Sequence, residues 1–367
     1  MNILFVMTVI GIIMGFMFQK NRAVTIYNSV LMWMITGWQY NTADYYNYNR
    51  IFLKSADNIS LSFFGQPIYY LINLLVKKCN GNFQMVYIIC GFIAVVTLVI
   101  GIQLFTDRAN LVISFFMISS FLLYAVQIRN FVAISFILVA TSYIVGEEKN
   151  ILKFVVLVLI ASGFHVTALF YLILLLIPYL NTVRTLILTA VLCVGAYYSR
   201  NMMSSILTSI GMLDYTASSH DTFTIMVYNI FSGVIILITI YLCYLIEKNK
   251  EYYLDFDKES GKSTIGFSRA ARQIASLMLV CIPLQFVTIE AVRLCRNLFP
   301  LFFCVIARLY PLDLKINIRA IKSLELYFGI IVIAMIGYSL LYGDLYIYRQ
   351  CYKTVLIPLF ENNLLIN

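Results

Sequence analysis

The sequence predicts an all-α polytopic integral membrane protein, and three observations support this fold class. Hydrophobic residues make up 62% of the 367 residues and charged residues only 12%, whereas soluble domains average about 25% charged residues. The mean hydropathy is +0.88. The basic residues stand mostly between long apolar runs, so the net charge of +9 fits cationic cytoplasmic loops. We therefore expect no nucleic-acid partner.

The apolar runs predict about 12 transmembrane helices, because a bilayer-spanning helix needs about 20 mostly apolar residues and fewer where flanking residues snorkel. The first run lacks a basic n-region and a small-residue cleavage site, and Lys20 and Arg22 follow it. We predict a retained anchor with its N-terminus outside, not a cleaved signal peptide. The predicted spans cover residues 3–18, 23–40, 83–105, 110–126, 130–146, 151–165, 166–182, 185–199, 222–245, 273–289, 297–310 and 324–342.

This orientation places most lysines and arginines on the cytoplasmic side, as membrane proteins prefer. Lys77 and Lys78 are the exception, because they follow an apolar segment too short to span. The chain is predicted to form a single transmembrane domain, 1–367. Three soluble stretches are expected within it: an outer loop with an interfacial helix at 41–82, an outer loop at 200–221, and a charged cytoplasmic loop at 247–272.

The sequence lacks the motifs of several other classes of function. The eight cysteines are scattered without CxxC spacing, which argues against zinc and redox chemistry. Gly261, Lys262 and Ser263 read as the end of a phosphate-binding loop, but the upstream glycine is absent. A nucleotide-driven transporter is therefore disfavoured.

Three arginines at the edges of apolar runs are candidate ligands for an anion. Ionisable groups are expensive to hold there, so they are candidates for function, and the predicted topology places all three outside. Arg129 can bind phosphate oxygens in a bidentate manner, or it can snorkel to lipid headgroups. Arg293 and Arg296 are three residues apart and share a helix face, so both can converge on one anion. Alternatively, Glu290 pairs with Arg293 and Arg296 snorkels.

One histidine and one tyrosine-rich string complete the set of outer candidates. His165 lies at the seam of two spans, where an imidazole could accept a proton near neutral pH or bond to backbone carbonyls at a helix end. Asp44, Tyr45 and Tyr48 begin an outer string of aromatic and polar residues. The string could hold sugar rings, or it could be an interfacial aromatic belt. Asp44 could orient a hydroxyl, act as a base, or cap the next helix.

These residues together predict a cationic outer cavity that has a base candidate beside it. The ligand that fits is a membrane lipid with a phosphate or diphosphate and a polar head group. Fixed arginines can stabilise a departing diphosphate without a metal. The single carboxylate of the outer string does not suggest a metal site, and we expect no cofactor.

The ordered motifs of the chain resemble those of the EpsG-like branch of the Wzy-type polysaccharide polymerases. The matching elements are Asp44 with the tyrosines after it, Gln127 to Asn130, His165 with Thr167, and Arg293 to Phe299. Two positions depart from the pattern: Val166 stands where relatives often have proline, and Asn130 where glutamine is frequent. Neither departure removes a charge or a base.

This resemblance implies a GT-C-like glycosyltransferase in the bacterial cytoplasmic membrane. It would join undecaprenyl-diphosphate-linked oligosaccharide units on the outer face into capsule, exopolysaccharide or O-antigen. A chain-length regulator and a flippase of the same pathway are the implied partners, beside membrane lipid. The implied catalytic residues are Asp44, Arg129, His165 and Arg293. The implied substrate-binding residues are Tyr45, Tyr48, Gln127, Thr167, Glu290 and Arg296.

Other functions remain open at the level of sequence. The runner-up enzymes are another lipid-linked glycosyltransferase and an O-antigen ligase, which differ from a polymerase in their acceptor. A flippase for lipid-linked oligosaccharides and an acyltransferase belong to different classes. A flippase should carry charged residues deep within its spans, and here they are few.

Overall fold

The described chain is helical from end to end, which confirms the predicted fold class at the level of an all-helical membrane protein. The computed structural model describes residues 2–55, 65–146, 149–209, 222–251, 253, 263–288, 290–309, 329 and 352–366. Within these residues, five helical segments are long and apolar enough to cross a membrane: Phe83–Phe105, Ile128–Val145, Thr182–Met202, Asn229–Lys248 and Thr264–Leu284. The count of about 12 spans and the GT-C-like architecture stay predictions.

Several predicted spans take a different form. Residues 110–126 form two helices, α7 (Ala109–Ser119) and α8 (Phe121–Val126), because Ser120 leaves helical geometry with φ −133° and ψ −12°. Residues 166–182 contain a 3-10 helix, η1 (Val166–Tyr179), and residues 297–310 contain the nine-residue α17 (Phe299–Ala307). The predicted span 324–342 lies outside the described residues.

The chain divides into two compact units. The first, called here the N-terminal unit, comprises Met1–Tyr143, Asn150–Ile173 and Tyr348–Asn367. Its elements are α1 (Ile3–Met17), α2 (Arg22–Gly37), α3 (Tyr45–Lys54), α5 (Pro67–Lys78), α6 (Phe83–Phe105), α7, α8, most of α9 (Ile128–Val145), α10 (Ile151–Ser162), the start of η1, η4 (Tyr352–Leu356) and α20 (Ile357–Glu361).

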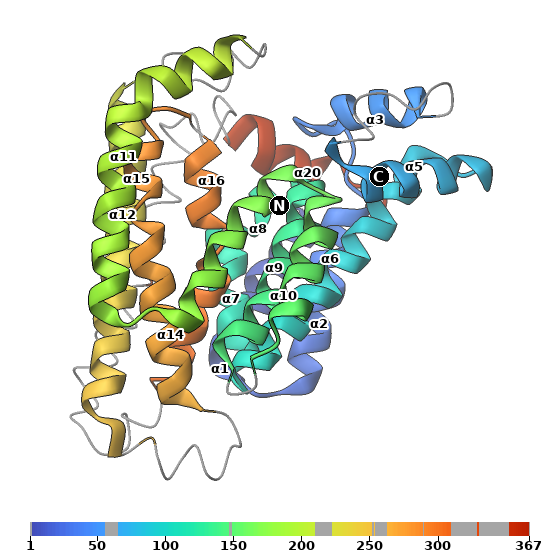
Figure 1. Cartoon of the computed structure of the whole chain (residues 1–367). Helices are drawn as coiled ribbons and strands as arrows, with labels where there is room; N and C mark the ends of the chain where they lie inside the picture. Colours follow the sequence, from blue (N-terminus) through green and yellow to red (C-terminus); the bar gives the residue numbers. More distant parts are fainter. Residues whose placement is uncertain are drawn as a thin grey trace. The chain divides into compact units, whose positions relative to one another are not determined.

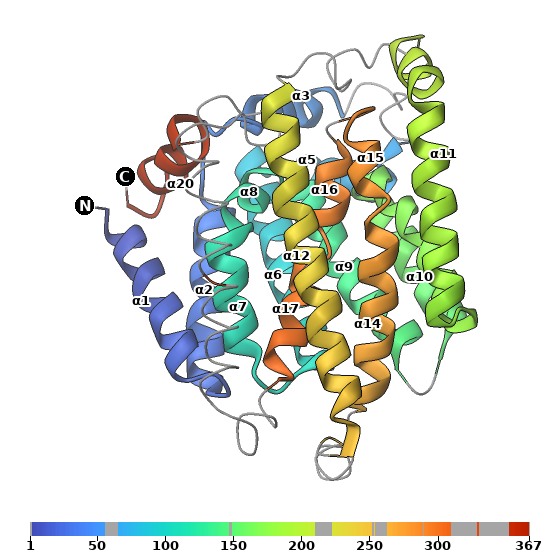
Figure 2. The same cartoon turned by 90° about the vertical axis from the view of Figure 1, so that its left-hand side faces the viewer.

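Small and polar residues hold α1, α2 and α7 side by side in the N-terminal unit (Figure 2). A Cβ atom on Gly15 of α1 would overlap the Ser114 hydroxyl of α7 and lie 2.9 Å from the Asn110 carbonyl oxygen. Ser114 donates a hydrogen bond to the carbonyl oxygen of Ile12, at 3.0 Å. Close approach through small residues and interhelical hydrogen bonds is how helices associate inside a bilayer, where no hydrophobic effect drives them together.

Asn110 fastens the connection between α1 and α2 to α7. Its side-chain amide donates to the carbonyl oxygens of Phe18 (2.7 Å) and Asn21 (2.8 Å). Its side-chain oxygen accepts from the Thr25 hydroxyl at 2.7 Å. The carboxamide of this fully buried residue is thereby satisfied on both sides, as a polar group in an apolar environment must be.

The C-terminal residues pack against the end of α2. Gln39 and Asn363 form an isolated antiparallel bridge, the Tyr40 amide donates to the Asn362 carbonyl oxygen at 2.9 Å, and the Leu364 amide donates to the Trp38 carbonyl oxygen at 2.9 Å. This contact fixes the chain just before α3, which carries Asp44 at its N-cap position.

The second unit comprises Ile144–Lys149 and Leu174–Ile347. Its described elements are the end of η1, α11 (Thr182–Ser209), α12 (Thr222–Lys248), α14 (Thr264–Met278), α15 (Cys281–Leu284), α16 (Glu290–Arg296) and α17. Figure 1 shows α11, α12 and α14 running alongside one another, and α14 contacts both neighbours. Helices α11 and α14 extend into the stretches 200–221 and 247–272 that the sequence predicts as loops.

Candidate functional site

A break between two helices positions Arg129. Helix α8 ends at Val126, and Gln127 adopts φ −88° and ψ 59° before α9 begins at Ile128. The Gln127 amide still donates to the Leu123 carbonyl oxygen (3.0 Å), and the Gln127 carbonyl oxygen accepts from the Phe131 amide (3.0 Å). Arg129 therefore stands in the first turn of α9, and Gln127 is buried at the break.

Two tyrosine rings and an amide hold the Arg129 guanidinium. Its Cζ atom lies 4.4 Å from the centroid of the Tyr48 ring and 5.7 Å from that of Tyr69. Its Nη1 donates to Gln66 Oε1. Arg129 makes no ion pair with the described residues, and its Nε is buried there without a hydrogen-bond partner. The aromatic faces stabilise the cation but do not neutralise it.

Asp44 connects to Arg129 through Tyr48. The Tyr48 hydroxyl donates to Asp44 Oδ2 at 3.2 Å. Asp44 occupies the N-cap position of α3, but its side chain makes no capping hydrogen bond. The capping alternative from the sequence is therefore wrong for this carboxylate, which remains available as a base or a hydroxyl acceptor. The structure brings together three predicted residues here: Asp44, Tyr48 and Arg129.

Gln66 and Tyr69 belong to this cluster, although sequence reasoning did not single them out. Tyr69 is 1% exposed, and its hydroxyl has no hydrogen-bond partner of normal geometry among the described residues. Burial raises the pKa of the Tyr69 phenol well above its ordinary value, and the smaller opposing effects of Arg129 and Asn73 do not offset it. The phenol therefore stays neutral, as a hydrogen-bond donor rather than an anion.

The turn before His165 holds the N-terminus of α5 and thereby supports the same cluster. The carbonyl oxygen of Gly163 accepts from the amides of Ile68 (2.9 Å) and Tyr69 (3.1 Å), two of the unsatisfied donors at the start of α5. A Cβ atom on Gly163 would lie 2.6 Å from the Ile68 side chain, so a larger residue would force Ile68 to move. The contact links the segment containing His165 to the residue that packs against Arg129.

The contacts of His165 with Thr167 favour one tautomer of the imidazole. The Thr167 amide donates to His165 Nδ1 at 3.4 Å, and the Thr167 hydroxyl lies 2.7 Å from the same nitrogen. A backbone N–H can only donate, so this contact favours the neutral tautomer with the lone pair on Nδ1 and the proton on Nε2. In this arrangement His165 presents an N–H donor through Nε2. Thr167, another predicted site residue, sets that orientation.

The described contacts of Tyr45 do not include the Arg129 guanidinium. Its ring stacks on Tyr87 at a centroid distance of 5.7 Å and meets Phe83 edge-on at 5.1 Å. Its hydroxyl lies 3.4 Å from Gln84 Oε1. These contacts fasten α3 to α6, and a role of Tyr45 in holding the acceptor stays a prediction.

The remaining predicted residues belong to α16 in the second unit. Arg296 is 1% exposed and Arg293 is half-buried, so both guanidinium groups are withdrawn from solvent on the same short helix. The Glu290 side chain lies outside the described residues, so the predicted pairing of Glu290 with Arg293 stays a prediction. That Arg293 and Arg296 bind the same ligand as Arg129 stays a prediction.

Two buried amides in the second unit were missed by the sequence reasoning. Gln285, which directly follows α15, is 0% exposed, and Asn229 of α12 is 8% exposed. In both, neither the amide nitrogen nor the amide oxygen has a hydrogen-bond partner among the described residues. Helices α12 and α15 both contact α16. The sequence does contain a signal for this position, because Gln285 is a polar residue inside an apolar run.

The fold and the cluster define a class: an all-helical membrane protein in which an arginine at a helix break lies against two tyrosine rings and makes no ion pair with the described residues. The sequence model of the EpsG family matches residues 23–353, and the chain belongs to this family. This confirms the family that the motifs indicated. No curated protein matches the chain, and no solved structure matches it.

Proposed function

We propose that this protein polymerises undecaprenyl-diphosphate-linked oligosaccharide repeat units into a surface polysaccharide, on the outer face of the bacterial cytoplasmic membrane. The membership in the EpsG family supports a polymerase-like role in polysaccharide synthesis. The single observation that carries the chemistry is the arrangement of side chains around the Arg129 guanidinium. The guanidinium is fixed by Tyr48, Tyr69 and Gln66, yet no carboxylate pairs with it in the described chain.

A fixed cation that makes no ion pair with the described residues suits a diphosphate leaving group. In the proposed step, an acceptor hydroxyl oxygen forms a bond to the anomeric carbon of the donor sugar, and the bond from that carbon to the diphosphate oxygen breaks. The lipid diphosphate departs with the bonding electron pair. Arg129 stabilises this developing charge, and because its position is set in advance, little reorganisation is needed.

The proton of the acceptor hydroxyl needs a base. The tautomer of His165 places an N–H on Nε2, which suits donation to a diphosphate oxygen better than proton removal. Asp44 accepts a hydrogen bond from Tyr48 and makes no helix cap. We therefore assign proton removal to Asp44 and hydrogen-bond donation to His165, with Thr167 as its positioning residue. Arg293 and Arg296 are proposed to bind the same diphosphate.

The test uses a strain that lacks the gene, complemented with full-length variants, and measures polysaccharide chain length on gels. Arg129→Ala is expected to reduce long-chain product by about 10²-fold, the typical effect of losing one preorganised donor to a developing oxyanion. Membrane content of each variant is measured alongside, so that failed insertion is recognised.

Arg200→Ala is the matched control, because Arg200 also lies over a tyrosine, with its Cζ 4.5 Å from the centroid of Tyr197. It is not part of the proposed site, so full chain length is expected. Normal polymer from Arg129→Ala, or equal loss from Arg200→Ala, would rule out the role assigned to Arg129. Single repeat units transferred to a lipid acceptor would indicate a ligase instead.

A further inference from the structure

A separate cavity lies in the second unit. Its volume is about 430 Å³, and it is lined by residues around the end of α9, the end of η1 and the first half of α14. This volume falls within the range of ligand-binding pockets, roughly 300–1,000 Å³. No residue of the proposed sugar-transfer site lines it.

Two cations without counter-ions line this cavity. Lys149, just after α9, and Arg269 of α14 are both exposed and make no ion pair with the described residues. Glu147 and Glu148, which precede Lys149 in the sequence, lie outside the described residues. Arginine binds phosphate oxygens in a bidentate manner and lysine adds a point charge, so the two together suit one phosphate group.

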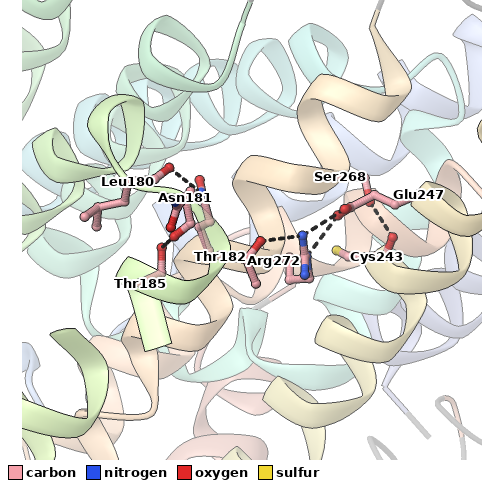
Figure 3. A network of polar contacts seen from close by, with 9 residues as sticks. Leu180, Asn181, Thr182, Thr185, Cys243, Glu247, Ser268 and Arg272 are labelled. Carbon is pink, nitrogen blue, oxygen red and sulfur yellow. Dashed lines mark hydrogen bonds and ion pairs between the residues drawn. The ribbon is translucent and has the colours of Figure 1, made fainter. Parts of the chain in front are cut away.

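The next arginine of α14 shows the opposite arrangement. Arg272 binds both carboxylate oxygens of Glu247, at 2.9 and 2.8 Å, and donates to the Thr182 hydroxyl at 2.9 Å (Figure 3). This arginine is neutralised and ties α14 to α11 and α12. Arg269, one turn away, makes no ion pair with the described residues. The difference indicates that Arg272 has a structural role and that Arg269 is available to a ligand.

Hydrogen bonds hold part of the cavity wall in place. The side-chain amide of Gln273 donates to the Leu180 carbonyl oxygen at 2.7 Å, which holds the end of η1 against α14. Asn181 caps α11 directly after it by accepting from the Arg184 amide at 2.9 Å. A pocket with a fixed wall loses little conformational entropy on binding.

Apolar side chains form part of the remaining lining, beside the Gln273 amide. Ile144, Val145, Ile177 and Pro178 contribute to it, together with Ala270 beside Arg269. Helices α9 and α14 both include candidate membrane spans, and the sequence predicts Lys149 and Arg269 on the cytoplasmic side. A ligand for such a lining carries a phosphate and a hydrocarbon part, and the cytoplasmic leaflet is rich in anionic lipid.

We propose that this cavity binds the phosphate of an anionic membrane phospholipid, with Lys149 and Arg269 as its phosphate ligands. The full-length protein, purified in detergent, would be titrated with phosphatidylglycerol, phosphatidylcholine or inorganic phosphate, and bound lipid would be counted by native mass spectrometry. Phosphatidylglycerol is expected to bind stoichiometrically and phosphatidylcholine weakly. Arg269→Gln and Lys149→Gln should each weaken phosphatidylglycerol binding by about fivefold, the typical effect of one cation near a membrane surface.

Arg184→Gln is the matched control, since Arg184 is an exposed cation of the same unit that does not line the cavity, and unchanged binding is expected. If Arg269→Gln does not fold, the charge reversal Lys149→Glu at an exposed position provides the same test. Equal binding by all variants would overturn the proposal. Inorganic phosphate that competes fully with the lipid would also overturn it, because the site would then take free anions.

Discussion

Arg129 shows how a membrane protein can hold a cation ready for an anionic ligand. A carboxylate partner would neutralise the guanidinium, and the ligand would have to displace it. The rings of Tyr48 and Tyr69 instead stabilise the charge by about 0.5–2 kcal/mol, and no described carboxylate forms an ion pair with it. The nearest described carboxylate in this chain of contacts, Asp44, bonds to the Tyr48 hydroxyl rather than to the arginine.

The two functions of Tyr48 can be separated by substitution. Tyr48→Phe keeps the ring over Arg129 and removes the hydrogen bond to Asp44, whereas Tyr48→Leu removes both. We expect Tyr48→Leu to lower polymer synthesis by roughly 2- to 30-fold more than Tyr48→Phe, the range that corresponds to one cation–π contact. Initial rates in membrane vesicles measure this. Equal rates for the two variants would show that the ring itself contributes nothing.

The tautomer of His165 predicts which substitution is tolerated. A glutamine amide can donate from about the position of Nε2 but cannot accept a proton near neutral pH. If His165 is a donor, His165→Gln should stay within about tenfold of the wild-type rate, and His165→Ala should lose about 10²-fold or more. If His165→Gln is as inactive as His165→Ala, the imidazole is the base and Asp44 is not.

At the scale of elements, the site depends on how α5 is docked. Helix α5 receives the Gly163 carbonyl oxygen at its N-terminus and contacts α3 and α6 along its length. The residues before and within its first turn, Gln66 and Tyr69, both contact Arg129. The position of α5 therefore sets the geometry around the guanidinium.

A substitution at Gly163 should displace α5. Gly163→Ala places a methyl group 2.6 Å from Ile68, and overpacking of this kind costs about 1–3 kcal/mol. We expect reduced polymer synthesis, restored in part by Ile68→Ala in the same chain. Gly195→Ala is the control, because a Cβ atom there meets nothing within 4 Å. Failure of Ile68→Ala to restore activity would mean that the clash is not the cause.

At the scale of the whole molecule, the residues that the sequence predicts for the site fall in both units. Asp44, Arg129 and His165 belong to the N-terminal unit, and Arg293 and Arg296 to the second. The proposed mechanism requires both groups of residues to bind one diphosphate. Residues that share one ligand show coupled effects, whereas independent residues show additive ones.

A double-mutant cycle tests this requirement. If Arg129 and Arg293 hold the same diphosphate, the loss of initial rate in the double alanine variant should be smaller than the product of the two single losses, by tenfold or more. The cycle of Arg129→Ala with Arg200→Ala is expected to be multiplicative. Multiplicative behaviour in the first cycle would separate Arg293 from the site.

The sequence predicts some of these features and misses others for physical reasons. The span 83–105 matches α6 because a long apolar run without breakers favours one uninterrupted helix. The break at Ser120 was missed because serine occurs in ordinary helices too. Asp44, Tyr48 and Arg129 were found because polar groups beside apolar runs are unusual. Gln66 and Tyr69 were missed because their role depends on Gly163, which is distant in sequence.

The pairing of Gln39 with Asn363 has a practical consequence for purification. Asn362 to Leu364 bind the backbone that leads into Asp44, so an affinity tag fused after them is expected to disturb the position of the Asp44 carboxylate. Such a fusion is expected to accumulate normally yet synthesise less polymer. A tag inserted between α12 and α14 avoids this pairing and is the better choice for purification.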